Sequence, residues 1–537
     1  MIDTPDLEWA ALLPELVTAI GAMLVLLVGM GRSARARVAT ASLTLLTFAV
    51  AAAVVLVDFH TPRYGAFVGQ LASDDVANIG RLLAIVAGAC ATVMAYRGRA
   101  DDGRHGEFHA LLLASVCGMG LMAGAASFVT LFIGLELFSI ALYVLCALDA
   151  ERMSSLEAGL KYLIVGGLSG AVLLYGSALV YGATGSLDFA RIGASDHRGI
   201  LLQAGAAMVL GGLAFKVSAA PMHWWTPDVY EGAGTPVTAF MSVATKAVAF
   251  VTLARVLTTA FAHEAHAWVP IIAGLAVVSI VVGNLGALVQ SHLKRMLAYS
   301  SIAQAGYLLC GLVAWDGDGI PALVYALAVY AAMTLGAFAA VLVIERDLGR
   351  DATFADLAGR GWIGSDDSLL RMVPALGLTI CMLALAGIPP TGGFFSKFGL
   401  FEAVVEADYA WLAVVGAVGS VVSLGYYLRV VVELYMQPRD ADRAALEAAS
   451  LPAPSTGGDQ RPSGTRMPLT ATLAVALAVV TLVLAFVPRP FFNAGCDARR
   501  ELLVLTGSCT HQTRASKPAA VDVTDAAVAN AIAPERG

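Results

Sequence analysis

Apolar runs of about 20 residues recur along almost the whole chain, and they limit the fold more than any other feature. Each run is long enough to cross a hydrocarbon core of roughly 30 Å as a helix. Only helices and closed barrels satisfy their backbone groups in lipid. The runs are continuous rather than alternating, which favours helices over a barrel. The sequence therefore predicts an all-α polytopic membrane protein.

Composition agrees with this class. The 537 residues are 58% hydrophobic and 14% charged, whereas a soluble domain carries about 25% charged residues. We count 14 spanning segments, over residues 8–30, 37–58, 78–97, 106–126, 128–148, 161–182, 200–230, 236–258, 267–290, 298–314, 320–344, 372–405, 409–433 and 468–488. Acidic residues precede the first segment, so it resembles a retained helix rather than a signal peptide.

The placement of Lys and Arg predicts the orientation. Basic residues gather in the segments 31–37, 96–105, 290–297, 345–361 and 437–466. The positive-inside rule places these segments in the cytoplasm, so both termini are expected outside. Residues 434–467 are rich in Pro, Ser, Gly and Ala and are expected to be a flexible cytoplasmic linker.

The tail after Pro488 has a soluble composition, and its end from about Ser516 is expected to be disordered. Cys496 and Cys509 share the outer, oxidising side, where they can form a disulfide; the alternative is two free thiols. The other five cysteines lie inside apolar runs as small buried residues. The sequence has no phosphate loop, dinucleotide fingerprint or iron–sulfur cysteine run, and we expect no redox cofactor and no metal in this chain.

Four charges lie near the middle of spanning segments: Glu136, Lys216, Lys246 and Lys397. Each costs about 2.5–3.5 kcal/mol at that depth on insertion scales. Intramembrane ionisable residues commonly mark ion paths, and a proton path is our first interpretation. The alternative is a kinked helix with snorkelling lysines, but lysines snorkel from helix ends.

Two of the segments contain prolines beside a lysine. Pro221 and Pro227 follow Lys216, whereas Pro389 and Pro390 precede Lys397. Proline removes a backbone donor and clashes with the preceding turn, so we expect the helices to break there. Paired interrupted helices in two halves of a chain are the best sequence sign of a transport site.

Lys246 follows on the next helix and is expected near Lys216. Two ammonium groups in a poorly solvated site disfavour each other's charge, so one can release its proton. Glu136 would be the counter-charge that decides when this happens. The four residues together predict a switchable proton relay.

Other candidates have an equally simple structural explanation. His223 can take a proton on the cytoplasmic side or cap a turn. Gln304 and Tyr307 can hold water or pack. Lys161 is expected at the start of a helix, where it is either functional or interfacial.

Three stretches resemble a known family. HWWTPDVYEGAGTPV (residues 223–237) and IPPTGGFFSKF (388–398) are similar to signatures of subunit N of proton-pumping NADH:quinone oxidoreductase, respiratory complex I. LKRMLAYSSI (293–302) resembles a stretch shared by the antiporter-like subunits. The resemblance spans about residues 106 to 433.

The resemblance implies 14 helices with two inverted five-helix repeats, each with a proline-broken helix. The implied divisions are helices 1–3 in 1–105, the repeats in 106–258 and 267–433, the linker in 434–467, the last spanning helix in 468–488 and an outward tail in 489–537. It implies a proton relay through Glu136, Lys216, Lys246 and Lys397.

The resemblance also implies partners. Flavin, iron–sulfur clusters and NADH would be bound by partner subunits, and quinone by a neighbouring subunit of the membrane arm. This chain would act with them as an H⁺-translocating enzyme, in contact with lipids and not with nucleic acid. Its Ala- and Arg-rich residue usage indicates a high-GC bacterium and hence the bacterial cell (inner) membrane; an organelle membrane is the alternative.

Two positions depart from the family pattern. Gln304 stands where members often have histidine; glutamine holds water but does not titrate. Gly234 replaces a proline and should loosen its turn.

Three alternative functions agree with parts of the sequence. A subunit of a multisubunit sodium/proton antiporter shares the broken helices, but the TPDVYEG stretch argues against it. Another antiporter-like subunit of complex I would have glutamate at Lys397 or an added lateral helix, and the sequence has neither. The third is a scaffold in which the charges only pin helices together.

Overall fold

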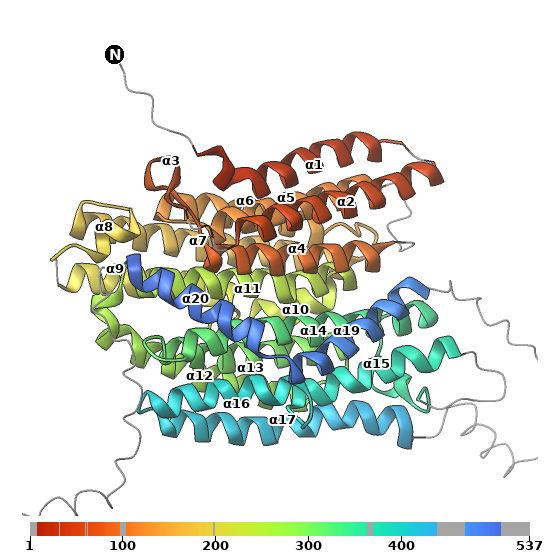
Figure 1. Cartoon of the computed structure of the whole chain (residues 1–537). Coiled ribbons are helices and arrows are strands. Elements are labelled where there is room, and N and C mark those ends of the chain that lie inside the picture. The colour runs from red at the N-terminus through yellow and green to blue at the C-terminus, as the bar shows by residue number, and fades with distance from the viewer. Residues whose placement is uncertain are drawn as a thin grey trace, which may run out of the picture.

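Long helices run side by side through the molecule, as the computed structural model shows (Figure 1). The structure describes residues 8–31, 33–59, 61, 63–96, 104–196, 199–361, 369–437 and 468–505. Within them, 12 helices are long and apolar enough to cross a membrane. Two interrupted segments make up the predicted 14, so the helical membrane fold is confirmed.

The N-terminal part consists of three crossing helices and a small hairpin. A short 3-10 turn, η1 (Trp9–Leu12), leads into α1 (Leu13–Gly29), which is followed by α2 (Ala34–Asp58) and α4 (Asp75–Ala95). Strands β1 (Arg63–Gly65) and β2 (Leu71–Ser73) pair antiparallel around the short α3 (Ala66–Gly69). Asp74 accepts from the Ala77 amide and so caps the start of α4.

The next part contains the first interruption. It comprises α5 (His105–Ala123), α6 (Phe128–Cys146), α7 (Met153–Thr184), the short α8 (Phe189–Gly193), α9 (Ile200–Lys216), α10 (Trp225–Gly232) and α11 (Thr235–Thr259). The crossing breaks between α9 and α10, where Pro221 lies. Pro227 is a correction: it lies in the first turn of α10, where a missing amide costs no helical hydrogen bond.

The second interruption lies between α15 and α16. This part comprises η3 (Ala262–Glu264), α12 (Ala265–Leu288), α13 (Leu293–Val313), α14 (Gly319–Leu348), η4 (Ala355–Leu357), α15 (Leu369–Ala386), α16 (Gly392–Glu406) and α17 (Ala410–Met436). Pro389 and Pro390 fall in the gap, as predicted. The inverted relation of the two parts stays a prediction.

Two helices end the described chain. α19 (Pro468–Phe486) is the last crossing, and α20 (Arg489–Leu505) leads on from its end and runs obliquely over α14 and α4 (Figure 1). The sequence prediction missed α20 because its polar face masks its apolar one. Ala498 and Leu502, four residues apart, are buried on that apolar face.

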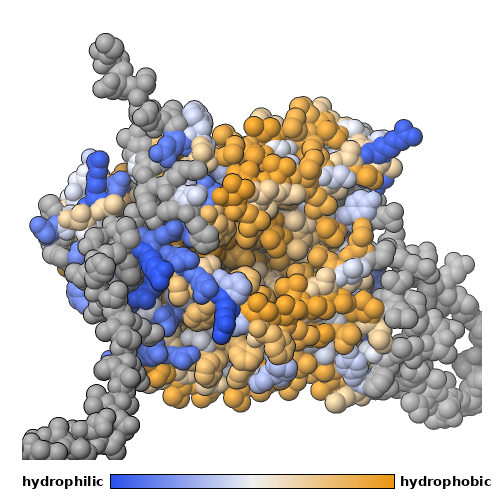
Figure 2. Space-filling view, viewed as in Figure 1, coloured by the Kyte–Doolittle hydropathy of each residue, from blue (hydrophilic) through white to orange (hydrophobic). Residues whose placement is uncertain are grey.

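Burial separates central from peripheral helices. Every residue of α11 is buried, and α13 and α14 are nearly so. Leu27 of α1 and Val421 of α17 are 65% and 67% exposed. Figure 2 shows apolar side chains covering much of one face, with hydrophilic residues gathered toward one end and along α20. An apolar exterior around a buried centre is what a bilayer solvent favours.

Candidate functional site

Lys216 is the last residue of α9 and is 1% exposed. Its Nζ donates to the Ser139 hydroxyl of α6 at 2.7 Å. The centroids of the Phe138 and Tyr162 rings lie 5.2 and 5.8 Å from the ammonium. Ring faces at this distance attract a cation. The first break therefore holds its ammonium with one hydroxyl and a set of aromatic rings.

Glu136 lies on α6, one turn before Ser139, and is half-buried. It interacts electrostatically with Lys216, but the two make no ion pair within the described residues. A Cβ atom added to Gly170 of α7 would lie 2.5 Å from Oε1 of Glu136. The absence of a side chain at Gly170 thus leaves the space that this carboxylate occupies.

Lys246 lies in the middle of α11 and is also 1% exposed. Its Nζ donates to both the carbonyl and the hydroxyl of Ser301 on α13. The Ser301 hydroxyl is 3.0 Å from the Tyr330 hydroxyl of α14. The Tyr330 ring centroid lies 5.5 Å from the ammonium. Lys246 is thus held by α13 and α14, and Lys216 by α6 and α7; the predicted closeness of the two lysines stays a prediction.

Lys397 lies in the second turn of α16 and is 6% exposed. Its Nζ donates to the carbonyls of Leu385 and Ala386 at 3.0 and 3.2 Å. These carbonyls end α15, where the break leaves them without helical partners. A helix C-terminus also carries partial negative charge, which favours a cation there. The Tyr307 ring centroid lies 4.8 Å from the ammonium.

One face of α13 connects the second and third lysines. Ser301 accepts from Lys246, and Gln304, one turn later, donates to the Leu385 carbonyl at 3.2 Å. Lys397 donates to that same carbonyl. Residues three apart lie on one side of a helix. Lys246 contacts this face of α13 directly, and Lys397 shares a carbonyl partner with a residue one turn further along it.

A second polar group surrounds this series. The Ser300 and Tyr427 hydroxyls are 2.5 Å apart. Asn284 donates to the Tyr307 hydroxyl at 3.1 Å and accepts from the Tyr426 hydroxyl at 3.0 Å. These buried groups satisfy one another, which keeps them in fixed positions.

Ion pairs link the part of the chain from α5 to α11 with the part from α12 to α17, at the predicted cytoplasmic end. Asp228 of α10 binds Lys161 of α7 and Arg295 of α13, each at 2.8 Å. The prediction that Lys161 starts a helix is wrong. Lys161 lies well inside α7, which begins at Met153 because residues 153–160 continue the helical pattern. Lys161 is 42% exposed and belongs to this ion-pair group rather than to the buried lysines.

Asp351, in the loop after α14, makes a second link. It binds Lys294 of α13 at 2.9 Å and Arg152 of the loop before α7 at 2.6 Å. Burial opposes ionisation of the Asp351 carboxyl, but Lys294 and Arg152 outweigh it and hold its pKa below its ordinary value of 3.8. These ion pairs thus connect the two parts of the chain at the predicted cytoplasmic end.

His223 lies in the gap between α9 and α10 and is half-buried. Its Nδ1 is buried and has no hydrogen-bond partner within the described residues. Its backbone carbonyl accepts from the Thr226 amide at 2.9 Å. The main chain thus closes the turn, and the imidazole also interacts with the Pro221 backbone inside the break.

The sequence did not point to several residues that hold the lysines. These are Ser139, Ser301 and Tyr330, which directly contact Lys216 or Lys246. The paired serines of LKRMLAYSSI were the available signal, since polar residues inside an apolar segment need a reason. Cys496 lies on α20, and its predicted disulfide partner Cys509 lies outside the described residues.

No group of three His, Cys, Asp or Glu side chains suited to a metal ion occurs in the described part of the chain. The polar groups that gather at this site are amines, carboxylates, hydroxyls and amides. Such groups carry protons or ions through hydrogen-bonded contacts.

Comparisons with known proteins agree with this arrangement. Residues 125–423 match the family model described as NADH:quinone oxidoreductase/Mrp antiporter, TM. NADH-quinone oxidoreductase subunit N of Trichlorobacter lovleyi is 38% identical over 441 residues, which cover 80% of this chain and 88% of the relative.

Solved structures give the same result. A chain of respiratory complex I from Thermus thermophilus with bound aureothin has a TM-score of 0.71 and 32% identity, covering 90% of this chain and 98% of that one. A chain of the Mrp complex from Dietzia sp. has a TM-score of 0.77 and 21% identity, covering 92% and 97%; at that identity the likeness shows the fold alone. The chain therefore belongs to the family of NADH-quinone oxidoreductase subunit N.

Proposed function

We propose that this chain is a proton-translocating membrane-arm subunit of respiratory complex I. It couples NADH oxidation and quinone reduction, carried out by partner subunits, to proton transfer across the membrane. The observation that carries the proposal is the face of α13 on which Ser301 contacts Lys246 and Gln304 shares the Leu385 carbonyl with Lys397. Buried amines whose partners lie one turn apart on one helix face are what supports a proton relay here.

Each buried group has a distinct role in this relay. Glu136 attracts the proton of Lys216, and the Ser139 hydroxyl receives the hydrogen bond that Lys216 donates. Ser301 and Tyr330 hold Lys246, and Gln304 spans the distance to the carbonyl shared with Lys397. Glutamine does not titrate, so a proton crosses this step along hydrogen-bonded groups or water rather than by residence on residue 304.

The proposed setting follows from the family and the charge pattern. The chain lies in the bacterial inner membrane beside other membrane-arm subunits, with both termini outside. Flavin, iron–sulfur clusters and NADH belong to partner subunits, and quinone binds at a neighbouring one. The residue groups 106–258 and 267–433 are proposed as the inverted repeats, each containing one interrupted crossing.

The test separates pumping from assembly. Inverted membrane vesicles carrying Lys397→Ala should retain the complex, as shown by co-purification, and lose at least about tenfold in proton pumping. Arg191→Ala, which removes an exposed charge on α8, is the matched control and should pump normally. Normal pumping by Lys397→Ala would overturn the relay, and loss of assembly alone would favour the scaffold.

The sodium/proton antiporter alternative has less support, because the Mrp chain shares only 21% identity with this one. The same vesicles decide it. Sodium-dependent proton movement that persists without NADH would favour the antiporter.

A further inference from the structure

The helix α20 connects elements that are far apart in the sequence. At its first half, Phe492 packs on Tyr325 of α14, with ring centroids 6.3 Å apart. Gly495 lies so close to α14 that an added Cβ atom would be 2.5 Å from the Pro321 Cα. Arg499, just past the middle of α20, also donates to the Asp316 carbonyl before α14. This half of α20 is therefore seated on α14.

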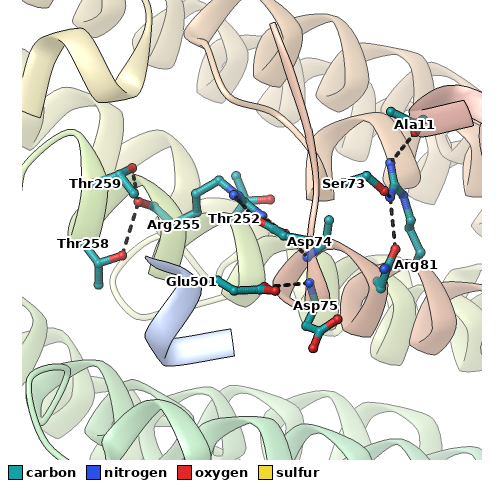
Figure 3. Close-up of polar contacts among 12 residues, drawn as sticks. Ala11, Ser73, Asp74, Asp75, Arg81, Thr252, Arg255, Thr258, Thr259 and Glu501 are labelled. Atoms are coloured by element: carbon teal, nitrogen blue, oxygen red, sulfur yellow. Dashed lines mark hydrogen bonds and ion pairs between the residues drawn. The ribbon is translucent and has the colours of Figure 1, made fainter. Parts of the chain in front are cut away.

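The second half reaches α4 and its neighbour α11 (Figure 3). Oε2 of Glu501 accepts from the Asp75 amide, the first residue of α4, at 2.7 Å. The adjacent Asp74 binds the Arg255 guanidinium of α11 with both oxygens, at 2.7 and 2.5 Å. Asp74 and Arg255 are 0% and 1% exposed. α20 thus lies as a strap from α14 to the α4–α11 pair.

The charges around Glu501 are unbalanced. Asp74 and Asp75 of α4 face it, and Arg255 of α11 is the nearby cation, already committed to Asp74. Further charged groups near the strap are Asp497, Arg499 and Arg500 on α20 itself, Asp316 and Asp318 before α14, and Arg81 of α4, whose charge also acts on Asp74. Docking of α20 therefore adds a third carboxyl group beside two carboxylates.

The protonation of Glu501 responds to this surrounding. Burial, followed by the charges of Asp74 and Asp75, raises the pKa of Glu501 from its ordinary value of 4.5 to about 8. The Asp75 amide and Arg255 act in the opposite direction but do not cancel these effects. Glu501 lies outside the crossing helices, where protons exchange with water.

We propose that α20 is a pH-sensitive strap, in which Glu501 takes up a proton as α20 docks on α4. Low pH then tightens the clasp between α14 and the α4–α11 pair, and high pH loosens it. The contacts that carry this proposal lie within the chain and do not depend on the proposed proton relay. The proposed orientation decides only that the strap responds to the outer compartment.

The direction follows from linkage. A free Glu501 side chain is ionised above about pH 4.5, whereas the docked one remains protonated up to about pH 8. Docking therefore binds a proton between these values, and the docking constant falls as pH rises, by at most about tenfold per unit. Solvent screening of the half-exposed carboxyl reduces this, so we expect at least about threefold between pH 6 and 8.

Cys496, on α20 and partly exposed, gives a built-in readout. The five cysteines of the crossing helices are buried. In the assembled complex, with Cys509→Ser in every variant, a membrane-impermeant maleimide should label Cys496 faster as α20 undocks. Glu501→Gln is the matched control, because it keeps the size of the side chain and the thiolate chemistry of Cys496 but cannot ionise. Gly495→Val, which forces α20 off Pro321, gives the undocked limit.

We divide the labelling rate of Cys496 in the chain that keeps Glu501 by the rate in Glu501→Gln. This ratio should rise at least about threefold from pH 6 to 8. A ratio that does not change with pH would overturn the proposal of a pH-sensitive strap. So would a chain with Glu501 that is labelled as fast as Gly495→Val at every pH, because α20 would then never be docked. If Glu501→Gln fails to assemble, hydrogen exchange of the α20 amides in the unmodified chain decides. After correction for intrinsic rates, protection that does not fall between pH 6 and 8 contradicts the proposal.

Discussion

Each of the two interrupted crossings holds a buried lysine beside a proline break, but the groups that hold the lysine differ. At the first, Lys216 faces a hydroxyl and aromatic rings supplied by other helices. At the second, Lys397 is held by the carbonyls that its own interruption frees. Because the lysine precedes the break in one case and follows it in the other, only the second lysine can reach back to the end of the preceding helix.

This difference concerns stability as well as function. Carbonyls at a helix end need partners when buried, so Lys397 both stabilises the break and carries charge. The Ser139 hydroxyl, to which Lys216 donates, itself donates to the Leu135 carbonyl and so keeps a partner without Lys216. Lys216 is therefore free to serve the relay alone. The predictions below test this contrast, beginning with the largest effect.

The largest effect is expected from glycines beside the two breaks. A Cβ atom at Gly393 would overlap the Ala384 carbonyl oxygen and lie 2.6 Å from its carbon, whereas at Gly211 the nearest atom is the Met222 methyl at 3.9 Å. Gly393→Ala should cost more than about 4 kcal/mol and remove the subunit from the membrane. Gly211→Ala should change stability by less than about 1 kcal/mol. Quantifying the chain in membranes checks both; equal amounts would show that the second break is not tightly packed.

The next contrast removes each ammonium with a side chain of similar length. Lys397→Met leaves the Ala386 carbonyl without its partner, at a cost of about 1–3 kcal/mol. Lys216→Met places an apolar chain among rings and should be within about 1 kcal/mol of neutral. Both variants should lose pumping. Thermal unfolding of the purified complexes measures the difference, and equal destabilisation would mean that the two lysines are held alike.

The sequence predicted the interruptions but not the way each lysine is held. Pro221 and the Pro389–Pro390 pair marked the gaps because proline acts locally, through its ring and missing amide. The partners Ser139, Ser301 and Tyr330 come from other helices, and their contacts depend on helix packing that no local pattern encodes. The strap α20 was missed for a related reason: an amphipathic helix of this length has no strong apolar signal until its docking face is known.

A third prediction concerns the link between Lys246 and Lys397. Gln304→Leu should lower pumping about tenfold with assembly intact, because the side chain no longer donates to the Leu385 carbonyl. Gln304→His keeps a donor and should restore most of the rate, with a new dependence on pH near neutrality. Pumping in vesicles between pH 6 and 8 measures both variants. Unchanged pumping by Gln304→Leu would show that the path between the lysines avoids α13.

The smallest effect is expected at Asp351, whose ion pairs with Lys294 and Arg152 connect the two parts of the chain. The pKa of Asp351 is held below its ordinary value of 3.8 in the folded chain, so its pairing stabilises the fold above about pH 4 and is lost as pH falls further. Asp351→Asn should therefore lower the thermal midpoint at pH 6, and the difference from the unmodified chain should shrink as pH falls below about 4. The pair partners Lys294 and Arg152 are 2% and 26% exposed, and solvent screening limits the effect to about 1 kcal/mol. Asp356→Asn, in the same loop but paired within it to Arg350, is the matched control. If both variants lower the thermal midpoint equally, the structure of the loop, rather than the ion pairs between the two parts, stabilises the chain. The difference between the two interruptions would then depend on local packing alone.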